Sequence, residues 1–513
     1  MGLGNGIKKA IGIEGSAKDT LLPMLGYQSA SIMLGGAGYI VLLYFMTYLT
    51  EVEGLSAAQA GLAHLIPIIW DAITDPVMGI ITDRTRSRMG KHRPWFLVGA
   101  LPVAVFYFLM WYSCGISGQG NSSATMWYYI CTYALYKTAY TITAIPHAAM
   151  LPGIAPGYFE RTQYNSVGYI MNSVGQISSF LLVSVTLGFM NMDMPGPELR
   201  GKYAVLGLIL GIWFGLPWLL AFFGTKEPSS LGMPAQPNDL RSNLKEIAQV
   251  FRSRAFRRYF FLTLCYNIAV GLRYNSNQYF VLYIAKRWNR YNLLTTVSGI
   301  AEASGFPLNF WLVKRFGKQS CGKLLTPVMV AGILLNLFIT SNTSPGMVTV
   351  LLFVSAVLYN LGCSGPGFVA TNIHADVTDV DEMITGRKRE GVVSIFNSVF
   401  MRKTINGFMA GFVGFVLQAF GFVTGTAKEG IPQTAAAVFG LRFVFIILPA
   451  VFAALCFFGI RQYKMTKEDH ETLKKAIDEK HETGRAELTP EQAARIEALA
   501  GLPMEEMWVG RPM

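Results

Sequence analysis

The chain has 513 residues, of which 52% are hydrophobic and only 14% are charged, and the apolar residues come in long blocks separated by short charged segments. A block of about 20 apolar residues can cross the hydrocarbon core of a bilayer, so this composition predicts a polytopic helical membrane protein rather than a water-soluble one. The net charge of +12 does not indicate a nucleic-acid partner, because lysine and arginine concentrate in alternate loops.

Twelve membrane spans can be placed along the chain. We expect them at 24–50, 57–82, 94–114, 124–150, 162–190, 203–223, 257–286, 289–313, 322–341, 346–374, 391–424 and 433–460. The longest polar interruption divides them six and six and is rich in proline, as expected for a linker between two transporter halves. We therefore expect a six-helix bundle over 1–223, a cytoplasmic linker over 224–256, a second bundle over 257–461 and a cytoplasmic helical tail over 462–513.

The basic loops set the expected orientation. Basic runs follow the second, sixth, eighth and tenth spans, so the positive-inside rule places these loops and both termini in the cytoplasm of a cell-membrane protein. In the tail, Thr466 and Thr489 can cap helices, the second followed by Pro490 and by Gln492. We expect this tail to be mainly structural, with a regulatory role as the alternative.

One run in and after the second span is unusually specific: it reads Trp70-Asp71-Ala72-Ile73-Thr74-Asp75-Pro76, then Asp83-Arg84-Thr85-Arg86-Ser87-Arg88-Met89-Gly90-Lys91-His92-Arg93-Pro94-Trp95. Further matches are Tyr140-Thr141, Ile145-Pro146, Glu160-Arg161, the acidic run 376–382 and Arg389-Glu390-Gly391. This pattern resembles the glycoside-pentoside-hexuronide:cation symporters of the major facilitator superfamily. The resemblance implies an all-α membrane protein with twelve transmembrane helices in two six-helix bundles. It also implies alternating access, with a cation moving together with solute.

Two aspartates in the second span predict the coupling site. Asp71 and Asp75 are four residues apart and share a helix face, and an intramembrane carboxylate is a functional hypothesis by default. Two such charges repel, share a proton or bind a cation, so they respond to Na⁺ or H⁺. Counting along the spans puts Thr141 at the depth of Asp71, and the resemblance implies that these three residues bind the cation. In a Na⁺-coupled carrier the aspartates are metal ligands; the alternative is a structural ion pair.

Lys137 complicates this site, since it lies one turn from Thr141 on the same helix face, where the resembling symporters have glycine. Its ammonium group could neutralise the aspartates and compete with Na⁺, which favours proton coupling or uncoupled exchange. Alternatively, the side chain snorkels toward the outer surface. Both alternatives remain open at this point.

The expected solute site departs from the sugar transporters of the family. The positions that match their sugar-binding carboxylates and tryptophan are Gly35, Ala144 and Ala148, and a helix-five arginine is replaced by Tyr169. Galactoside specificity is therefore not expected. The remaining polar candidates are Lys403, Arg273, Tyr140, His147, Tyr169, Asn172, Gln176 and Asn406.

Lys403 and Arg273 are positively charged, and the sugar-binding carboxylates are missing. This combination favours an anionic solute such as a hexuronide, which an arginine can clamp through two hydrogen bonds. For Arg273 the alternative is an ion pair with Glu302, which falls at almost the same depth in the next span. For His147 the alternative to a proton relay is a packed imidazole.

Charged clusters next to the spans predict gates. On the first half these are Asp83, Arg84, Arg88 and Arg93, and on the second half Asp376, Asp379 and Arg389. Ion pairs that break between two states would give the inward opening a defined barrier. Basic loops also fix topology, and the two roles are compatible.

We expect a cation-coupled carrier of a small sugar-derived or anionic solute, monomeric in the bilayer, with no cofactor beyond the co-transported Na⁺ or H⁺. The alternatives are a carrier of lysolipids or other amphiphiles and, from another class, a non-transporting membrane sensor. An enzyme is not expected, because the sequence has no H-E-x-x-H, G-x-S-x-G or Walker motif.

Overall fold

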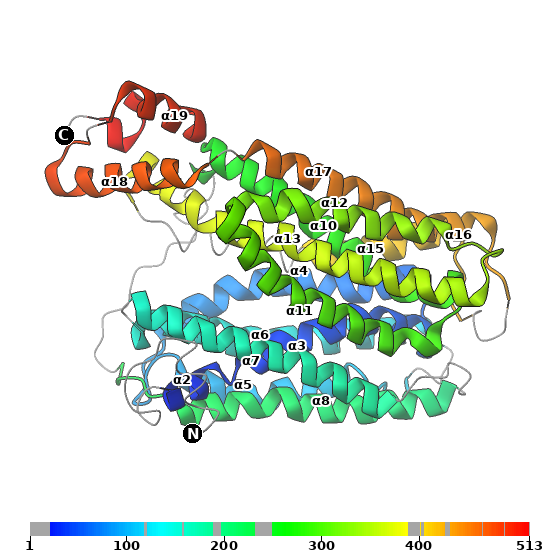
Figure 1. Cartoon of the computed structure of the whole chain (residues 1–513). Coiled ribbons are helices and arrows are strands. Elements are labelled where there is room, and N and C mark those ends of the chain that lie inside the picture. The colour runs from blue at the N-terminus through cyan, green and yellow to red at the C-terminus, as the bar shows by residue number, and fades with distance from the viewer. Residues whose placement is uncertain are drawn as a thin grey trace, which may run out of the picture. The chain divides into compact units, whose positions relative to one another are not determined.

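A computed structural model describes residues 21–116, 121–155, 158–187, 196–230, 249–387, 401, 405–425, 431–463, 465–486 and 488–511. Within these ranges every regular element is helical (Figure 1). By length and composition alone, seven of the described helices are apolar enough to cross a membrane. The expectation of an all-α membrane protein is confirmed.

The helices of the first half follow the expected spans closely. They are α2 (Leu21–Gln28), α3 (Ser31–Ile40), π-helical turns at Val41–Phe45 and Tyr48–Val52, α4 (Ala57–Arg84), α5 (Arg93–Leu109), α6 (Ser122–Ile154), α7 (Tyr158–Leu187) and α8 (Gly196–Gly224). Here α3 packs on α7, α4 on α6, and α5 on both α6 and α8.

After the linker the chain forms a second series of helices. They are α10 (Arg254–Tyr279), a π-helical turn at Phe280–Ile284, a 3₁₀ turn at Trp288–Arg290, α11 (Tyr291–Phe316), α12 (Lys318–Leu334), a 3₁₀ turn at Leu335–Phe338, α13 (Pro345–Thr385), α15 (Ile405–Ala419), α16 (Ala435–Arg442), a π-helical turn at Phe443–Ile447 and α17 (Leu448–Gln462). The tail forms α18 (Lys467–Thr483), α19 (Pro490–Ala500) and 3₁₀ turns at Met504–Glu506 and Trp508–Gly510.

The chain divides into two compact units. The first comprises Met1–Asn238 with Asn277–Asn292 and Ala410–Gly440, and the second comprises Asp239–Ser276, Leu293–Met409 and Leu441–Met513. The first unit therefore includes the segment between α10 and α11 and most of α15 with the loop that follows it. In the second unit, α12 packs on α13 and α17, and α18 packs on α13 and α19.

The tenth span differs from its expected length. Hydropathy predicts a span that ends at residue 374, but α13 continues to Thr385 and ends at Gly386, which has a positive φ of 70°. At 1.5 Å per residue the extension adds about 16 Å of helix. It places Asp376 and Asp379 on a rigid helix, where their side chains have fixed directions.

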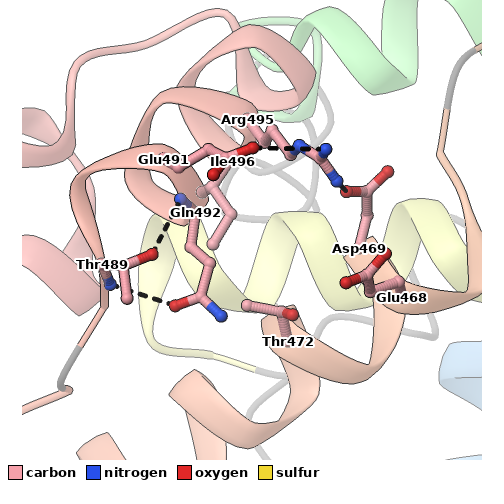
Figure 2. A pocket seen from close by; sticks show the side chains of 8 residues that line it. All are labelled: Glu468, Asp469, Thr472, Thr489, Glu491, Gln492, Arg495 and Ile496. Carbon is pink, nitrogen blue, oxygen red and sulfur yellow. Dashed lines mark hydrogen bonds and ion pairs between the residues drawn. The ribbon is translucent and has the colours of Figure 1, made fainter.

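Both predicted helix starts in the tail are confirmed. Thr466 accepts a hydrogen bond from the main-chain N–H of Asp469, and Thr489 accepts one from Gln492, each within a complete capping box. A cavity of about 170 Å³ lies between these two helix starts (Figure 2). Arg495 spans it, within 3.5 Å of carboxylate oxygens of both Asp469 and Glu491.

Candidate functional site: a buried carboxylate pair with a resident lysine

The centre of the site is the pair of aspartates on α4. Asp71 is 0% exposed and Asp75 is 4% exposed, although α4 presents other side chains such as Ile69 and Ile73 to the outside. The helix stays continuous through Pro76, which has no N–H to bond the main-chain carbonyl of residue 72.

Thr141 on α6 joins the two carboxylates. Its Oγ1 lies 3.0 Å from Oδ1 of Asp71 and 2.9 Å from Oδ1 of Asp75, and the residue is only 1% exposed. The close packing of α4 on α6 brings these three side chains together, as their equal depth in the sequence had suggested.

Lys137, one turn earlier on α6, also reaches the pair. Its Nζ lies 3.3 Å from Oδ2 of Asp71, and its side chain is 14% exposed. The rings of Tyr133 and Tyr140 lie 5.8 and 5.6 Å from the ammonium nitrogen, within range of a cation–π interaction. The lysine therefore points to the aspartates and does not snorkel toward a membrane surface.

His147, expected near the solute, is enclosed by aromatic side chains. Its ring stacks on Tyr27 at 4.1 Å, and the rings of Trp218 and Phe96 lie 5.6 and 5.9 Å away. Its Nε2 is 3.1 Å from the carbonyl of Tyr27, whose hydroxyl in turn bonds the carbonyl of His147. With 5% exposure and its Nε2 engaged, His147 is packed as the imidazole alternative expects.

The three α7 candidates differ in exposure. Tyr169 is 63% exposed, whereas Asn172 and Gln176 are partly buried. Asn172 lies against Gly35 on α3, where an added Cβ would be 2.6 Å from the Asn172 side-chain oxygen and would collide with its main-chain carbonyl. An acidic side chain at position 35, as in the sugar transporters of the resemblance, does not fit this helix crossing.

In the second unit, Arg273 on α10 is 5% exposed. Its guanidinium carbon lies 3.5 Å from the ring centre of Phe445 and 5.1 Å from that of Tyr359, and it donates to the Phe445 carbonyl at 3.4 Å. Both Arg273 and Glu302 are described, and no ion pair joins them. Lys403 lies outside the described residues, as does the side chain of Asn406 in α15.

The basic loop after α4 carries the charges that the sequence predicts to act as a gate. Lys91 lies 3.4 Å from Asp83, whereas Arg84 and Arg88 are exposed. Arg93 donates to the carbonyl of Phe222 at 2.8 Å and covers its ring. These charges therefore fix the loop within the first unit.

Glu227, just after α8, is a partner that the sequence did not reveal. Its Oε1 lies 2.5 Å from Nδ1 of His92, and its Oε2 accepts from the main-chain N–H groups of His92 and Arg93 at 3.0 and 3.2 Å. Burial alone would raise the pKa of the Glu227 carboxyl, but these hydrogen bonds and the His92 charge hold its pKa below the usual value. Gly90, at a φ of 94°, leaves room for this carboxylate.

The acidic run on α13 faces the tail. Nε2 of His470 on α18 lies 2.9 Å from Asp379 and 3.8 Å from Asp376. The sequence grouped Arg389 with these carboxylates, but Arg389 lies outside the described residues. Sequence reasoning missed this contact, because the tail histidines carry no local signal of a distant partner.

A second buried carboxylate lies at the opposite end of α4 from the basic loop. Glu51, in the π-helical turn Tyr48–Val52, is 6% exposed and accepts from the hydroxyl of Tyr283 at 2.7 Å and from the N–H of Gly425 at 3.2 Å. Nearby, Thr50 Oγ1 lies 2.9 Å from the hydroxyl of Tyr279. Three segments far apart in the sequence are thus fastened together at this end of the first unit.

Helices of membrane-spanning length around a buried carboxylate pair define a transporter of the major facilitator fold. The chain belongs to the family described as MFS/sugar transport protein, whose model matches residues 26–467. This match confirms the expected family, the glycoside-pentoside-hexuronide:cation symporters, and the protein is a membrane transporter and not an enzyme.

Relatives from several organisms cover most of the chain. The inner membrane symporter YicJ of Escherichia coli is 26% identical over 437 residues, which cover 84% of this chain and 89% of the relative. The isoprimeverose transporter of Lactiplantibacillus pentosus is 26% identical over 451 residues, covering 86% and 88%. The sodium-dependent lysophosphatidylcholine symporter 1-A of Danio rerio is 22% identical over 441 residues, covering 77% and 78%.

Solved structures show the same fold. A variant of the nucleoside transporter NupG aligns with a TM-score of 0.60 at 14% identity, covering 86% of this chain and 99% of that one. A bacterial homologue of the lysosomal transporter Spinster, in an inward-facing state, aligns with a TM-score of 0.54 at 16% identity. At these identities the likeness concerns the fold alone.

Proposed function

We propose that the protein is a proton-coupled symporter of a small organic solute, sugar-derived or anionic such as a hexuronide, working by alternating access. The observation that carries the choice of ion is the 3.3 Å contact between the Lys137 ammonium and Asp71. A cation held permanently at the carboxylates supplies the charge that Na⁺ would bring. A proton is then the ion left to bind and leave.

The hydrogens at Thr141 support this choice. A hydroxyl group has one hydrogen, yet Oγ1 lies within hydrogen-bond distance of both aspartates. Two ionised carboxylates sharing one hydrogen would also face each other as like charges. The arrangement is satisfied when Asp75 carries a proton and donates to Thr141, which donates to Asp71 beside the ammonium group. The loaded site is then electrically neutral.

The solute site is proposed on weaker support. Tyr140, Asn172 and Gln176 offer hydrogen-bonding groups from the first half. From the second half, Arg273 is a buried guanidinium with no carboxylate bonded to it among the described residues. A buried cation of this kind favours an anion. Tyr169 and the partly or wholly undescribed Lys403 and Asn406 remain candidates.

We assign the halves to 1–223 and 257–461, joined by the linker at 224–256 and followed by the tail at 462–513, with both termini cytoplasmic and a monomer as the working unit. The contacts of Glu51 then lie on the outer side and close it. The basic loop with Asp83 and the acidic end of α13 are then each assigned to the inner side, as candidate elements of the inner gate that alternating access requires.

Uptake into proteoliposomes tests the proposal. An inside-alkaline pH gradient without Na⁺ should drive accumulation of a glucuronide or a pentose disaccharide, and Asp75→Asn should abolish this accumulation while sparing solute exchange. Lysophosphatidylcholine in the same assay tests the amphiphile alternative suggested by the Danio rerio relative. Accumulation driven by Na⁺ alone would refute proton coupling. A protein that moves none of these solutes under either gradient would refute the symporter proposal.

A further inference from the structure

The tail helix α18 presents two histidines to the acidic end of α13. His470 Nε2 lies 2.9 Å from Asp379 Oδ2 and 3.8 Å from Asp376 Oδ1, and His481 Nε2 lies 3.4 Å from Glu382 Oε1. The two histidines are eleven residues apart, which is three helical turns, so they share one face of α18. That face follows the same stretch of α13 that carries the carboxylates.

Apolar packing holds the same two helices together. Leu473 and Ile477 of α18 are 0% and 5% exposed and belong to one buried cluster with Val377, Val380 and Met383 of α13, each 0% exposed. Burial of two such side chains contributes about 3 to 6 kcal/mol before the cost of ordering the tail is subtracted. Further along the tail, Ile496, Leu499, Met507 and Val509 belong to the same buried cluster, so the tail as a whole has a broad apolar contact. The charged pairs at the edge of α18 adjust how tightly this one helix is held.

The last residues of the tail close this contact. The indole of Trp508 lies 4.6 Å from the ring of His481 and covers Gly386, where an added Cβ would be 2.8 Å from the indole. Lys480 donates to the main-chain carbonyl of Arg511. The chain thus returns to the end of α13 after passing through α19.

The charged groups around the two histidines are mainly acidic. The elements packed on α18 are α13, α19 and the turn at Trp508–Gly510. Among the described residues, α13 contributes Asp376, Asp379, Asp381 and Glu382. From α19, Arg495 is directed to Asp469 and Glu491 (Figure 2), Glu497 accepts from the N–H of Met504, and the final turn has no ionisable side chain. Tyr463 lies near Asp376 and Asp379.

We infer that α18 is a proton-sensitive latch on the inner end of α13. Histidine changes charge near neutral pH, and its cationic form binds carboxylates much more strongly than its neutral form. The tail should therefore dock tightly when the cytoplasm is acidic and loosen when it is alkaline.

The latch has a consequence for transport. While the histidines occupy Asp376, Asp379 and Glu382, these carboxylates are less available to basic partners at the inner gate. Cytoplasmic acid should therefore slow turnover. A carrier that imports protons would then be inhibited by the protons that it releases into the cytoplasm. This feedback rests on the proposed proton coupling. The pH-dependent docking of the tail does not depend on which ion is coupled.

Hydrogen–deuterium exchange of the full-length protein in detergent tests docking directly. As pH rises from about 6 to about 8, protection of residues 467–483, corrected for intrinsic exchange, should fall several-fold, because cationic histidine binds carboxylates more strongly than neutral histidine does. The double variant His470→Gln/His481→Gln should lose this dependence. Lys475→Gln is the matched control, because Lys475 is 78% exposed and its ion pair within the described part of the chain is with Glu479 of the same helix.

The outcomes of this experiment are distinct. Equal protection of the wild-type tail at both pH values, or a double variant that keeps the pH difference, would overturn the latch. Solute counterflow without any gradient tests the regulatory role separately. Turnover at an internal pH of about 6 should be several-fold faster in the double variant, with KM unchanged. If internal acid slows turnover of the double variant as much as that of wild type, regulation by the tail is overturned. This conclusion holds whether the carrier is driven by H⁺ or by Na⁺.

Discussion

Replacement of Lys137 by methionine should convert the coupling site into one that responds to Na⁺. The ammonium lies 3.3 Å from Asp71, whose side chain has no exposure. Removal of one partner from a buried ion pair costs about 3 to 5 kcal/mol, because the other charge is left uncompensated. The vacated space, lined by two carboxylates and the Thr141 oxygen, is suited to a small cation that binds oxygen ligands.

Thermal unfolding in detergent, with NaCl compared to choline chloride at equal ionic strength, measures this change. At a hundredfold excess over its dissociation constant, Na⁺ should stabilise Lys137→Met by about 2.7 kcal/mol and leave wild type unchanged. Lys91→Met is the control, because Lys91 and Asp83 form a similar pair at 3.4 Å but are 32% and 26% exposed. Its loss should cost about 0 to 1 kcal/mol with no Na⁺ effect. The reasoning would be refuted if NaCl did not raise the unfolding temperature of Lys137→Met above its value in choline chloride, or if it raised that of wild type equally.

Three further predictions concern other parts of the chain. The pKa of the Glu227 carboxyl is lowered in the folded state, so the carboxylate stabilises the fold above its usual pKa and loses this effect as pH falls through the lowered value. Glu227→Gln should lower the free energy of unfolding by about 1 to 3 kcal/mol at pH 7. The variant's stability, measured by unfolding at decreasing pH, should also depend less on pH than that of wild type. Tyr283→Phe removes a 2.7 Å hydrogen bond to Glu51, so a thiol reagent added outside should label a cysteine introduced beneath this contact faster, in a background without the six native cysteines; unchanged labelling would argue against an outer gate. Gly35→Ala should reduce the yield of folded protein, whereas Gly38→Ala, with no heavy atom within 4 Å of its added Cβ, should not; equal yields would contradict the collision.

The proximity of the two aspartates, Thr141 and Lys137 could be predicted because its signal is local. Asp71 and Asp75 are four residues apart, and a charge inside an apolar block stands out against its surroundings. Thr141 and Lys137 followed from counting depth along straight helices. What the sequence left open was the direction of the lysine side chain, because a long flexible stem can reach either a buried carboxylate or a membrane surface.

Other contacts had no local signal. Glu51, Glu227 and His470 lie in short polar segments whose partners are distant in sequence, so neither periodicity nor hydropathy points to them. Hydropathy also ended the tenth span at residue 374, because it detects lipid contact and not helix formation; α13 continues beyond that point with polar residues. His147 was proposed to contact solute because it is polar, but aromatic packing gives it a place in the core.

The single hydrogen at Thr141 has an electrical consequence. If Asp75 binds the transported proton beside the Lys137–Asp71 pair, the loaded carrier crosses the membrane with no net charge at this site and the empty carrier returns with one negative charge. A membrane potential contributes about 2.3 kcal/mol per charge and 100 mV across the full field. With a neutral solute, an inside-negative cell would then accelerate the return of the empty carrier and leave the loaded step nearly insensitive to voltage.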